Sequence, residues 1–396
     1  MTGRRRRRRP DPGPVMNIRR SALAYETWLR TQLQGEVVED DLCEKHRLMG
    51  SDAFTFLRAT YWRWAETVLK ICPDLGRSPT VLAVGDIHLE NFGTWRDREG
   101  RLVWGVNDFD EAAEMAYVID IVRLATSALL ADVDGYKAGD ICGALLSGYV
   151  RGLHKPEAIV LDSREKWLRK RFEVGNKARK HFWRKLRGVA EAEGGPHPSP
   201  LPYINALEAA LPEGGMTFEF WPHVAGTGSL GRPRWIGRGN WHGGPIVREA
   251  KAIVPSAWGR AQRKLDRLRC TEIADGKYRS PDPWYRLDNA ILVRRLSPNN
   301  RKLNLGEVEC RGDLVNDKML EAMGRDLAAI HRASGGQKEI LDDLAAFGKK
   351  RIRSAVNAMA DSVRADHENW RDTRGKCHEV QPDHLYAGER SPTPTG

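Results

Sequence analysis

The stretch VLAVGDIHLEN, from Val81 to Asn91, decides the fold of this 396-residue chain. Its first four residues are a short apolar run between turn-forming residues, which is typical of a buried strand. Gly85-Asp86 follows directly, so the strand delivers an acidic side chain to a loop. Asn91 lies five residues after Asp86, and both carry oxygen atoms that can contact a cation or a polar substrate.

A hairpin is predicted directly after this loop. Thr94-Trp95 and the run from Leu102 to Val106 have strand character, and Asp97-Arg98-Glu99-Gly100 forms the turn between them. The second strand then returns Asn107-Asp108 to the side of the first loop. We therefore expect Asp86 and Asp108 to be neighbours in space.

These residues have the chemistry that phosphoryl transfer requires. A carboxylate orients or deprotonates the acceptor, and one or two further oxygen ligands hold Mg²⁺ against the nucleotide phosphates. Asp86 is suited to the first role, and Asn91 and Asp108 to the second. The predicted catalytic residues are Asp86 and His88, and the predicted metal ligands are Asn91, Asp108 and Asp110.

A glycine-rich turn occurs about 140 residues later, where strand-like residues precede Gly226-Thr227-Gly228-Ser229-Leu230-Gly231. It can cover the phosphates of a nucleotide, although a plain tight turn fits this short pattern equally well. The strand-like run from Ile246 follows, and a cation on it would contact the phosphates. The sequence leaves open whether that cation is Arg248 or Lys251. The predicted nucleotide-binding residues are Gly226, Gly228, Ser229, Gly231, Arg248 and Lys251.

The pattern Gly85-Asp86-x-His88-x-x-Asn91, followed by a strand and Asp108, resembles the catalytic loop of aminoglycoside phosphotransferases and choline kinases. Asp120 resembles the aspartate at the start of the next helix in those enzymes, where it is mainly structural. Val84 departs from the pattern, because those enzymes have a histidine before Gly-Asp.

A closer resemblance is to a bacterial family known as domain of unknown function 2252. It rests on Gly85 to Gly93, on Asn107-Asp108-Phe109-Asp110-Glu111, on Asp52 to Arg58 and on the glycine-rich turn, and it spans most of residues 40–335. It implies a kinase-like fold with an undetermined substrate, using ATP and Mg²⁺. In ordinary kinases the glycine-rich loop precedes the catalytic loop, so the order here predicts circular permutation.

The expected fold class is therefore α+β, with two lobes. Helical periodicity predicts amphipathic helices from Ala53 to Ile71 and from Met115 to Leu130, among others. The predicted divisions are a disordered basic tail at 1–16, a helical lobe with the catalytic loop and hairpin at 17–187, a β-rich glycine-loop lobe at 200–300, C-terminal helices at 301–371 and a disordered tail at 372–396.

The net charge of +11 includes six arginines from Arg4 to Arg9, so most of the excess belongs to the N-terminal tail. This run could bind nucleic acid, but a solvated tail explains it as well. The segment from Arg164 to Arg187 has eleven Lys/Arg and two Glu. A pair of amphipathic helices with inward aromatics is favoured there over RNA binding. The sequence has no apolar run long enough for a membrane span, and a cytoplasmic location is expected.

Two other functions fit parts of the pattern. Val84 to His88 also resembles a metal-ligand segment of calcineurin-like phosphoesterases, but Gly239-Asn240-Trp241-His242 has the wrong spacing for the rest of such a site. A nucleotide-binding module without turnover is the other alternative, because Arg248 stands near the usual lysine position. The acceptor, small molecule or protein, and the oligomeric state stay open.

Overall fold

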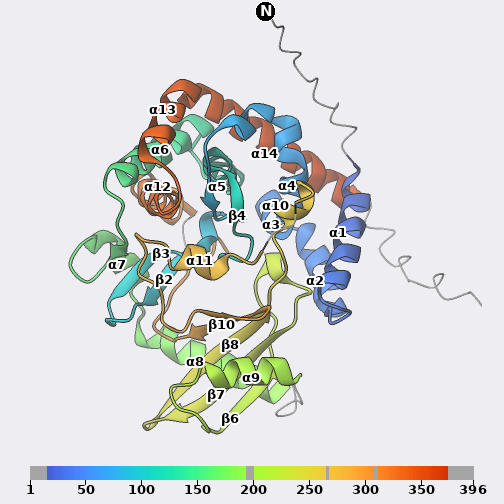
Figure 1. Ribbon diagram of the computed structural model, residues 1–396, viewed down its shortest axis with the longest axis vertical. Helices are drawn as coiled ribbons and strands as arrows, with labels where there is room; N and C mark the ends of the chain where they lie inside the picture. The colour runs from blue at the N-terminus through green and yellow to red at the C-terminus, as the bar shows by residue number, and fades with distance from the viewer. Residues whose placement is uncertain (1–15, 193–199, 265–266, 307–310, 373–396) are drawn as a thin grey trace, which may run out of the picture.

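The computed structural model describes residues 16–192, 200–264, 267–306 and 311–372 (Figure 1). Helices and several small sheets make up this part of the chain, which confirms the predicted α+β class. Of the disordered tails predicted at 1–16 and 372–396, residues 1–15 and 373–396 lie outside the described residues. None of the described helices is both long enough and apolar enough to cross a membrane.

Four helices open the described chain: α1 (Ile18–Gln32), α2 (Glu39–Met49), α3 (Ala53–Ala59) and α4 (Tyr61–Ile71). The prediction of one continuous helix from Ala53 to Ile71 is wrong, because the chain leaves helical geometry at Thr60, with φ −126° and ψ 42°. The Thr60 hydroxyl donates a hydrogen bond of 2.7 Å to Phe56 O at this break. Apolar residues keep a helical spacing on both sides, so periodicity alone does not reveal the break.

The stretch from Val81 to Asn91 begins in one small sheet and leads into a second one. Strand β1 (Thr80–Ala83) pairs with β4 (Ala113–Ala116), and β2 (Phe92–Arg96) pairs with β3 (Leu102–Val106), which also pairs with β5 (Ile159–Val160). The predicted strand and hairpin are thus present. The predicted helix start at Met115 is wrong, because Met115 pairs with Val81 in the first sheet and helix α5 (Tyr117–Leu130) begins only afterwards.

Helices α5, α6 (Ala138–His154) and α12 (Asp317–Arg332) form the centre of the helical part, with α13 (Gln337–Phe347) and α14 (Lys349–Asp372) beside them (Figure 1). Glycines let α6 and α12 approach closely. A Cβ on Gly148 would lie 2.0 Å from Glu321 O, and one on Gly324 would lie 2.2 Å from Leu145 O. The backbones of these two helices are therefore in direct contact.

A five-stranded antiparallel sheet lies at the other end of the molecule (Figure 1). Its order is β6-β7-β8-β10-β9, and the helix α9 (Leu201–Ala209) packs near β8 and β10. The strands are β6 (Phe218–Pro222), β7 (Arg234–Trp241), β8 (Gly244–Ala252), β9 (Arg286–Asp288) and β10 (Ile291–Leu296). Short helices α10 (Ala257–Ala261) and α11 (Cys270–Ala274) connect β8 to β9.

The basic segment forms two helices, α7 (Lys166–Phe172) and α8 (Asn176–Ala192). Phe172 is buried and packs edge-on against Trp104, and Trp183 is partly buried against a small apolar cluster of the five-stranded sheet. Aromatic side chains therefore face inward here, as expected for packed amphipathic helices. The Gly/Pro-rich break expected from Gly188 begins later, because α8 continues to Ala192, and 193–199 lie outside the described residues.

Candidate functional site

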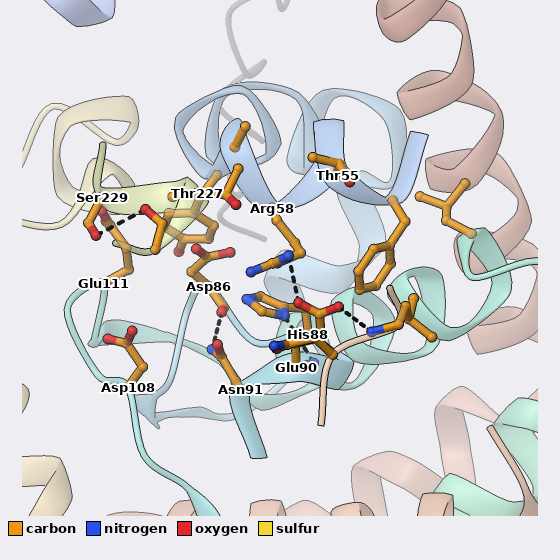
Figure 2. Close-up of a pocket in the computed structure, with 18 of the residues that line it drawn as sticks. Thr55, Arg58, Asp86, His88, Glu90, Asn91, Asp108, Glu111, Thr227 and Ser229 are labelled. Atoms are coloured by element: carbon orange, nitrogen blue, oxygen red, sulfur yellow. Dashed lines mark hydrogen bonds and ion pairs between the residues drawn. The ribbon is translucent and has the colours of Figure 1, made fainter. Parts of the chain in front are cut away.

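A cavity of about 1070 Å³ lies between the helical part and the glycine-rich turn, and the predicted catalytic loop lines it (Figure 2). Both acidic and basic side chains line it. The predicted site residues that line this cavity are Asp86, His88, Asn91, Asp108, Asp110, Gly226, Gly228 and Ser229.

Asp86 follows a tight turn at the end of β1. Gly85 adopts φ +80° there, and a Cβ on it would lie 2.3 Å from Glu111 O, so this position needs glycine. The Asp86 carboxylate forms an ion pair with the buried Arg123 of α5. Burial raises the pKa of Asp86, and the opposing effect of Arg123 does not cancel this. A carboxylate with a raised pKa is a better proton acceptor at neutral pH than an exposed aspartate.

Asn91 ends a 3₁₀ turn, Leu89–Asn91, and points back toward Asp86 (Figure 2). Its Nδ2 donates a hydrogen bond of 2.6 Å to the Asp86 carbonyl oxygen. Its own carbonyl accepts a bond of 3.1 Å from Asn107 N, which ties the loop to the end of the hairpin. With Nδ2 used as a donor, the amide oxygen Oδ1 of Asn91 remains available for a cation.

Asp108 lies just beyond β3, with its Oδ1 3.4 Å from the Lys251 Nζ. Burial works against its ionisation, but Lys251, Lys302 and Arg294 outweigh burial and hold the pKa of Asp108 well below its usual range. In the described part of the chain, no group of three or more His, Cys, Asp or Glu side chains could hold a metal by itself. Mg²⁺ needs fewer protein ligands, because it keeps several waters and uses substrate phosphates. An ionised Asp108 and the amide oxygen of Asn91 suit that mode of binding.

Asp110 forms ion pairs with two cations, Lys251 and Arg232. Its Oδ1 lies 2.7 Å from Lys251 Nζ, and its Oδ2 lies 3.7 Å from Arg232 Nη1. Burial and the neighbouring charge of Asp108 raise the pKa of Asp110. These contacts make Asp110 an anchor for Lys251 more than a metal ligand.

His88 lies inside the predicted catalytic loop and contacts its backbone. Its Nδ1 accepts a hydrogen bond of 3.2 Å from Glu90 N, and its ring packs edge-on against Phe54. Burial, reinforced by Arg58 and Arg123, holds the pKa of His88 well below its usual range, so the imidazole is neutral at pH 7. The contacts of His88 are thus with Glu90 of the loop and with Phe54 of α3.

Asp120 supports the turn that presents Asp86. Its carboxylate accepts hydrogen bonds of 2.7 Å from Val84 N and 3.0 Å from Gly85 N. His331 of α12 lies behind it, with Nε2 3.1 Å from Asp120 Oδ2 and Nδ1 2.8 Å from the hydroxyl of Tyr149. A histidine from the C-terminal part of the chain therefore stands under the loop that has Val84 before Gly-Asp.

An acidic residue of α12, Asp326, supports the end of the hairpin. Asp326 Oδ2 accepts a hydrogen bond of 2.8 Å from Val106 N, and Asp326 Oδ1 is 3.0 Å from Arg279 Nη1. Arg279 also donates to Val106 O at 2.5 Å. Helix α12 thus holds both the loop of Asp86 and the strand that leads to Asp108.

The glycine-rich turn lies directly on the catalytic loop (Figure 2). A Cβ on Gly228 would be 3.1 Å from Arg58 O and 3.2 Å from the carboxylate oxygen Oδ2 of Asp86. Lys45 of α2 holds this turn through a 2.8 Å hydrogen bond from Nζ to Gly228 O. Gly231 has a different role, because a Cβ there would lie 2.5 Å from Leu42, outside the cavity lining.

Arg248 and Lys251 lie on opposite faces of β8. Lys251 faces Asp108 and Asp110, whereas Arg248 donates from Nε to Ala210 O at 2.8 Å and stacks 4.4 Å above the Trp284 ring. Arg248 therefore points away from both acidic residues and is not among the residues that line either cavity. Lys251 lies three positions after Arg248, and an odd step along a strand places two side chains on opposite faces.

A second, smaller cavity of about 270 Å³ adjoins the first. It is mostly apolar, with Phe109, Tyr285 and Leu296 among its lining residues, and it includes the segment from Arg295 to Ser297. Arg294 and Lys302 line both cavities. The two spaces therefore meet at these two cations.

Sequence reasoning missed the cations of the site: Arg58, Arg123, Lys302, Arg232 and Arg234. Arg123 was detectable in principle, because it follows Asp120 by three residues and the two share one helix face. No pattern in the residues next to Lys302 in the sequence marks it as part of the site. The residues proposed for a phosphoesterase do not gather, since His242 lies at the exposed tip of the β7-β8 hairpin beside Glu213 and outside both cavity linings.

The comparisons with known proteins bear on one segment of the chain. No curated protein and no solved structure matches the chain. Residues 37–182, which include Asp86, Asn91 and Asp108, match the sequence profile of a family described as an uncharacterized protein conserved in bacteria, DUF2252, and the resemblance to this family is confirmed over that segment.

Proposed function

We propose that the protein is a phosphotransferase that uses Mg-ATP and is built on a circularly permuted, two-lobed kinase-like fold. The observation that carries this proposal is the meeting of Asp86, Asn91 and Asp108 at one cavity. A proton acceptor and two oxygen ligands for Mg²⁺ at one place are what phosphoryl transfer from a nucleotide needs.

The five-stranded sheet supports the kinase-like fold. Its glycine-rich turn joins the neighbouring strands β6 and β7, and Lys251 lies on the third strand, β8. Protein kinases likewise combine a glycine-rich loop over the phosphates with a lysine on the third strand. Here both elements follow Asp86 in sequence, and this order is the basis for proposing circular permutation.

In the proposed reaction, Asp86 orients the acceptor hydroxyl or amine and accepts its proton. Asn91 and Asp108 would hold Mg²⁺, which neutralises charge on the nucleotide phosphates when bound. The turn around Gly228 covers the reacting groups and limits the access of water. The Asp86 side chain is 19% exposed, so an acceptor can reach it from the cavity.

The smaller cavity suits the nucleobase. Its lining is mostly apolar and includes the aromatic rings of Phe109 and Tyr285, which pack against each other edge-on at 6.4 Å. A planar base can be held by such a wall, while its phosphates extend past Arg294 and Lys302 into the larger cavity. The nearby segment from Arg295 to Ser297 would then be the hinge beside the base.

A nucleotide-binding module without turnover is the second candidate. It is favoured by the ion pair between Asp86 and the fully buried Arg123. A buried carboxylate that is paired with a cation has a lower pKa than a buried carboxylate without one, and it is therefore a weaker base. This candidate binds the nucleotide at the same site but does not transfer the γ-phosphate.

Thermal shift with ATP and Mg²⁺ on the wild type and Asp108→Ala, together with a turnover assay on the wild type and Asp86→Ala, tests the proposal. We expect magnesium-dependent stabilisation that Asp108→Ala abolishes, and turnover that Asp86→Ala abolishes. Binding that requires Asp108 without any wild-type turnover supports the second candidate. Absence of nucleotide binding, with manganese-dependent phosphoesterase activity, contradicts both.

A further inference from the structure

Lys302 belongs to a segment that crosses the exit of the catalytic loop. Gly93 and Lys302 form an antiparallel β-bridge, and Thr94 N donates a hydrogen bond of 2.9 Å to Arg301 O. Arg301 N in turn donates to the Thr94 hydroxyl at 2.9 Å. The backbone at Lys302 and at the preceding Arg301 is thus fixed to β2, two residues after Asn91.

The crossing is close because residue 93 is glycine. A Cβ on Gly93 would lie 2.8 Å from Lys302 Cγ, 2.9 Å from Arg301 O and 2.7 Å from Asn107 Nδ2. The aliphatic stem of Lys302 therefore packs directly on the backbone of β2. This contact directs the lysine side chain along the strand toward the junction of the two cavities, both of which it lines.

Five other cations beside the cavities form ion pairs with acidic side chains. Arg58 lies 2.6 Å from Glu90, Arg232 lies 2.8 Å from Glu111, and Lys251 lies 2.7 Å from Asp110. Arg234 and Arg294 both pair with Glu249.

Lys302 differs from these cations, because it makes no ion pair or side-chain hydrogen bond with any residue that the structure describes. Burial lowers its pKa to about 8; Asp108 opposes this, and Arg294 and Lys251 reinforce it. The side chain is still mainly protonated at pH 7. An anion at the junction would relieve the repulsion among these cations.

We propose that Lys302 is the phosphate-binding cation of this site and contacts the polyphosphate chain of a nucleotide where it passes from the smaller cavity to the larger one. That the ligand is a nucleotide rests on the proposed function. The affinity of Lys302 for a polyphosphate does not. Lys251, although it occupies the position expected from kinases, lines neither cavity and has a side chain only 2% exposed. Its role is to hold Asp108 and Asp110 in place.

Isothermal titration calorimetry with inorganic tripolyphosphate at pH 7, without metal, tests this. Lys302→Met removes the charge and keeps an unbranched stem over Gly93, Lys302→Arg keeps the charge, and Lys318→Ala removes an exposed lysine at the start of α12. We expect tripolyphosphate to bind the wild type, binding to weaken about tenfold or more in Lys302→Met, and Lys302→Arg to retain most of it. Lys318→Ala should bind as the wild type does. Melting temperatures of all four proteins verify that they are folded.

The outcomes separate this inference from the proposed function. Equal affinity in folded Lys302→Met and wild type, or no binding of tripolyphosphate to the wild type, overturns the role of Lys302 whatever the turnover assay shows. Lys302-dependent binding of tripolyphosphate together with no binding or turnover of Mg-ATP supports the role of Lys302 and contradicts the kinase proposal.

Discussion

The imidazole of His331 contacts Asp120 beneath the turn that presents Asp86, with Nε2 3.1 Å from Oδ2. Both side chains are fully buried. The Asp120 carboxylate accepts hydrogen bonds from the backbone N–H groups of Val84 and Gly85. His331 holds this carboxylate in place and so also holds the loop. The geometry of the site thus depends on a residue that makes no contact with the cavity.

Replacing His331 with alanine should destabilise the fold and misplace Asp86. The change leaves the Tyr149 hydroxyl and one side of the Asp120 carboxylate without a partner in the core, at a cost of about 2–4 kcal/mol. Urea unfolding measures this cost. The matched control is His242→Ala, an exposed hairpin position that should change the unfolding free energy by less than about 0.5 kcal/mol. Equal stability of His331→Ala and wild type contradicts the supporting role.

Gly148→Ala should be strongly destabilising, because its new Cβ would meet the backbone of α12 at Glu321 O. The helices must separate, and we expect a loss on the order of 2–4 kcal/mol in chemical unfolding. Gly139→Ala is the control on the same helix, since its Cβ would be 3.8 Å from the nearest side chain. Higher helix propensity should leave that variant unchanged or more stable by up to about 1 kcal/mol. Similar effects of the two substitutions would show that the close contact of α6 and α12 is absent.

Asp86→Asn should lower turnover of Mg-ATP by about 10²–10⁴-fold if Asp86 accepts the proton. Nucleotide affinity should change little, because Asp86 is not among the proposed ligands of Mg²⁺ or phosphate. Steady-state kinetics and calorimetry with Mg-ATP separate the two effects. Glu99→Gln, in the exposed turn of the hairpin, serves as the control and should keep both values. A large loss of affinity with unchanged turnover at saturation would assign Asp86 to binding instead.

Stability should fall as the pH decreases from about 6.5 toward 4, in part because of His223. Burial, which Glu249 opposes and Arg234 reinforces, lowers the pKa of His223 from 6.5 to about 4. Between these values the unfolded chain binds the proton and the folded chain does not, so acid favours unfolding. Replacing His223 with glutamine should reduce the difference in unfolding free energy between pH 7 and pH 4.5 by roughly 2–3 kcal/mol. An unchanged pH dependence in that variant would mean that His223 is accessible to protons in the folded state.

Local patterns were sufficient to predict the strand and the hairpin that carry the candidate site. The apolar run before Gly85, the hairpin turn and the five-residue step from Asp86 to Asn91 are properties of neighbouring residues, and the structure contains the strand, the hairpin and the close approach of Asp108. The glycine-rich turn was recognised in the same way, but its contact with Asp86 was not. That contact depends on how two distant segments pack.

The missed features depend on such long-range packing. His331 and Lys302 stand in segments that look like an ordinary helix end and an ordinary loop, and only their spatial neighbours give them a role. The break at Thr60 was missed because apolar periodicity continues through it. The surroundings of Arg248 and Lys251 likewise depend on the pairing of β8 with β7 and β10, which fixes the face of each side chain.

The support that α12 gives to both acidic segments has a consequence for how the protein is made. His331 follows Asp120 by 211 residues, and Asp326 follows Val106 by 220 residues. A ribosome therefore completes Asp86 and Asp108 long before it delivers the helix that supports their segments. Throughout that interval the nascent chain has the side chains of the candidate site without these supports, so the arrangement described above forms only after α12 has emerged and docked against α6.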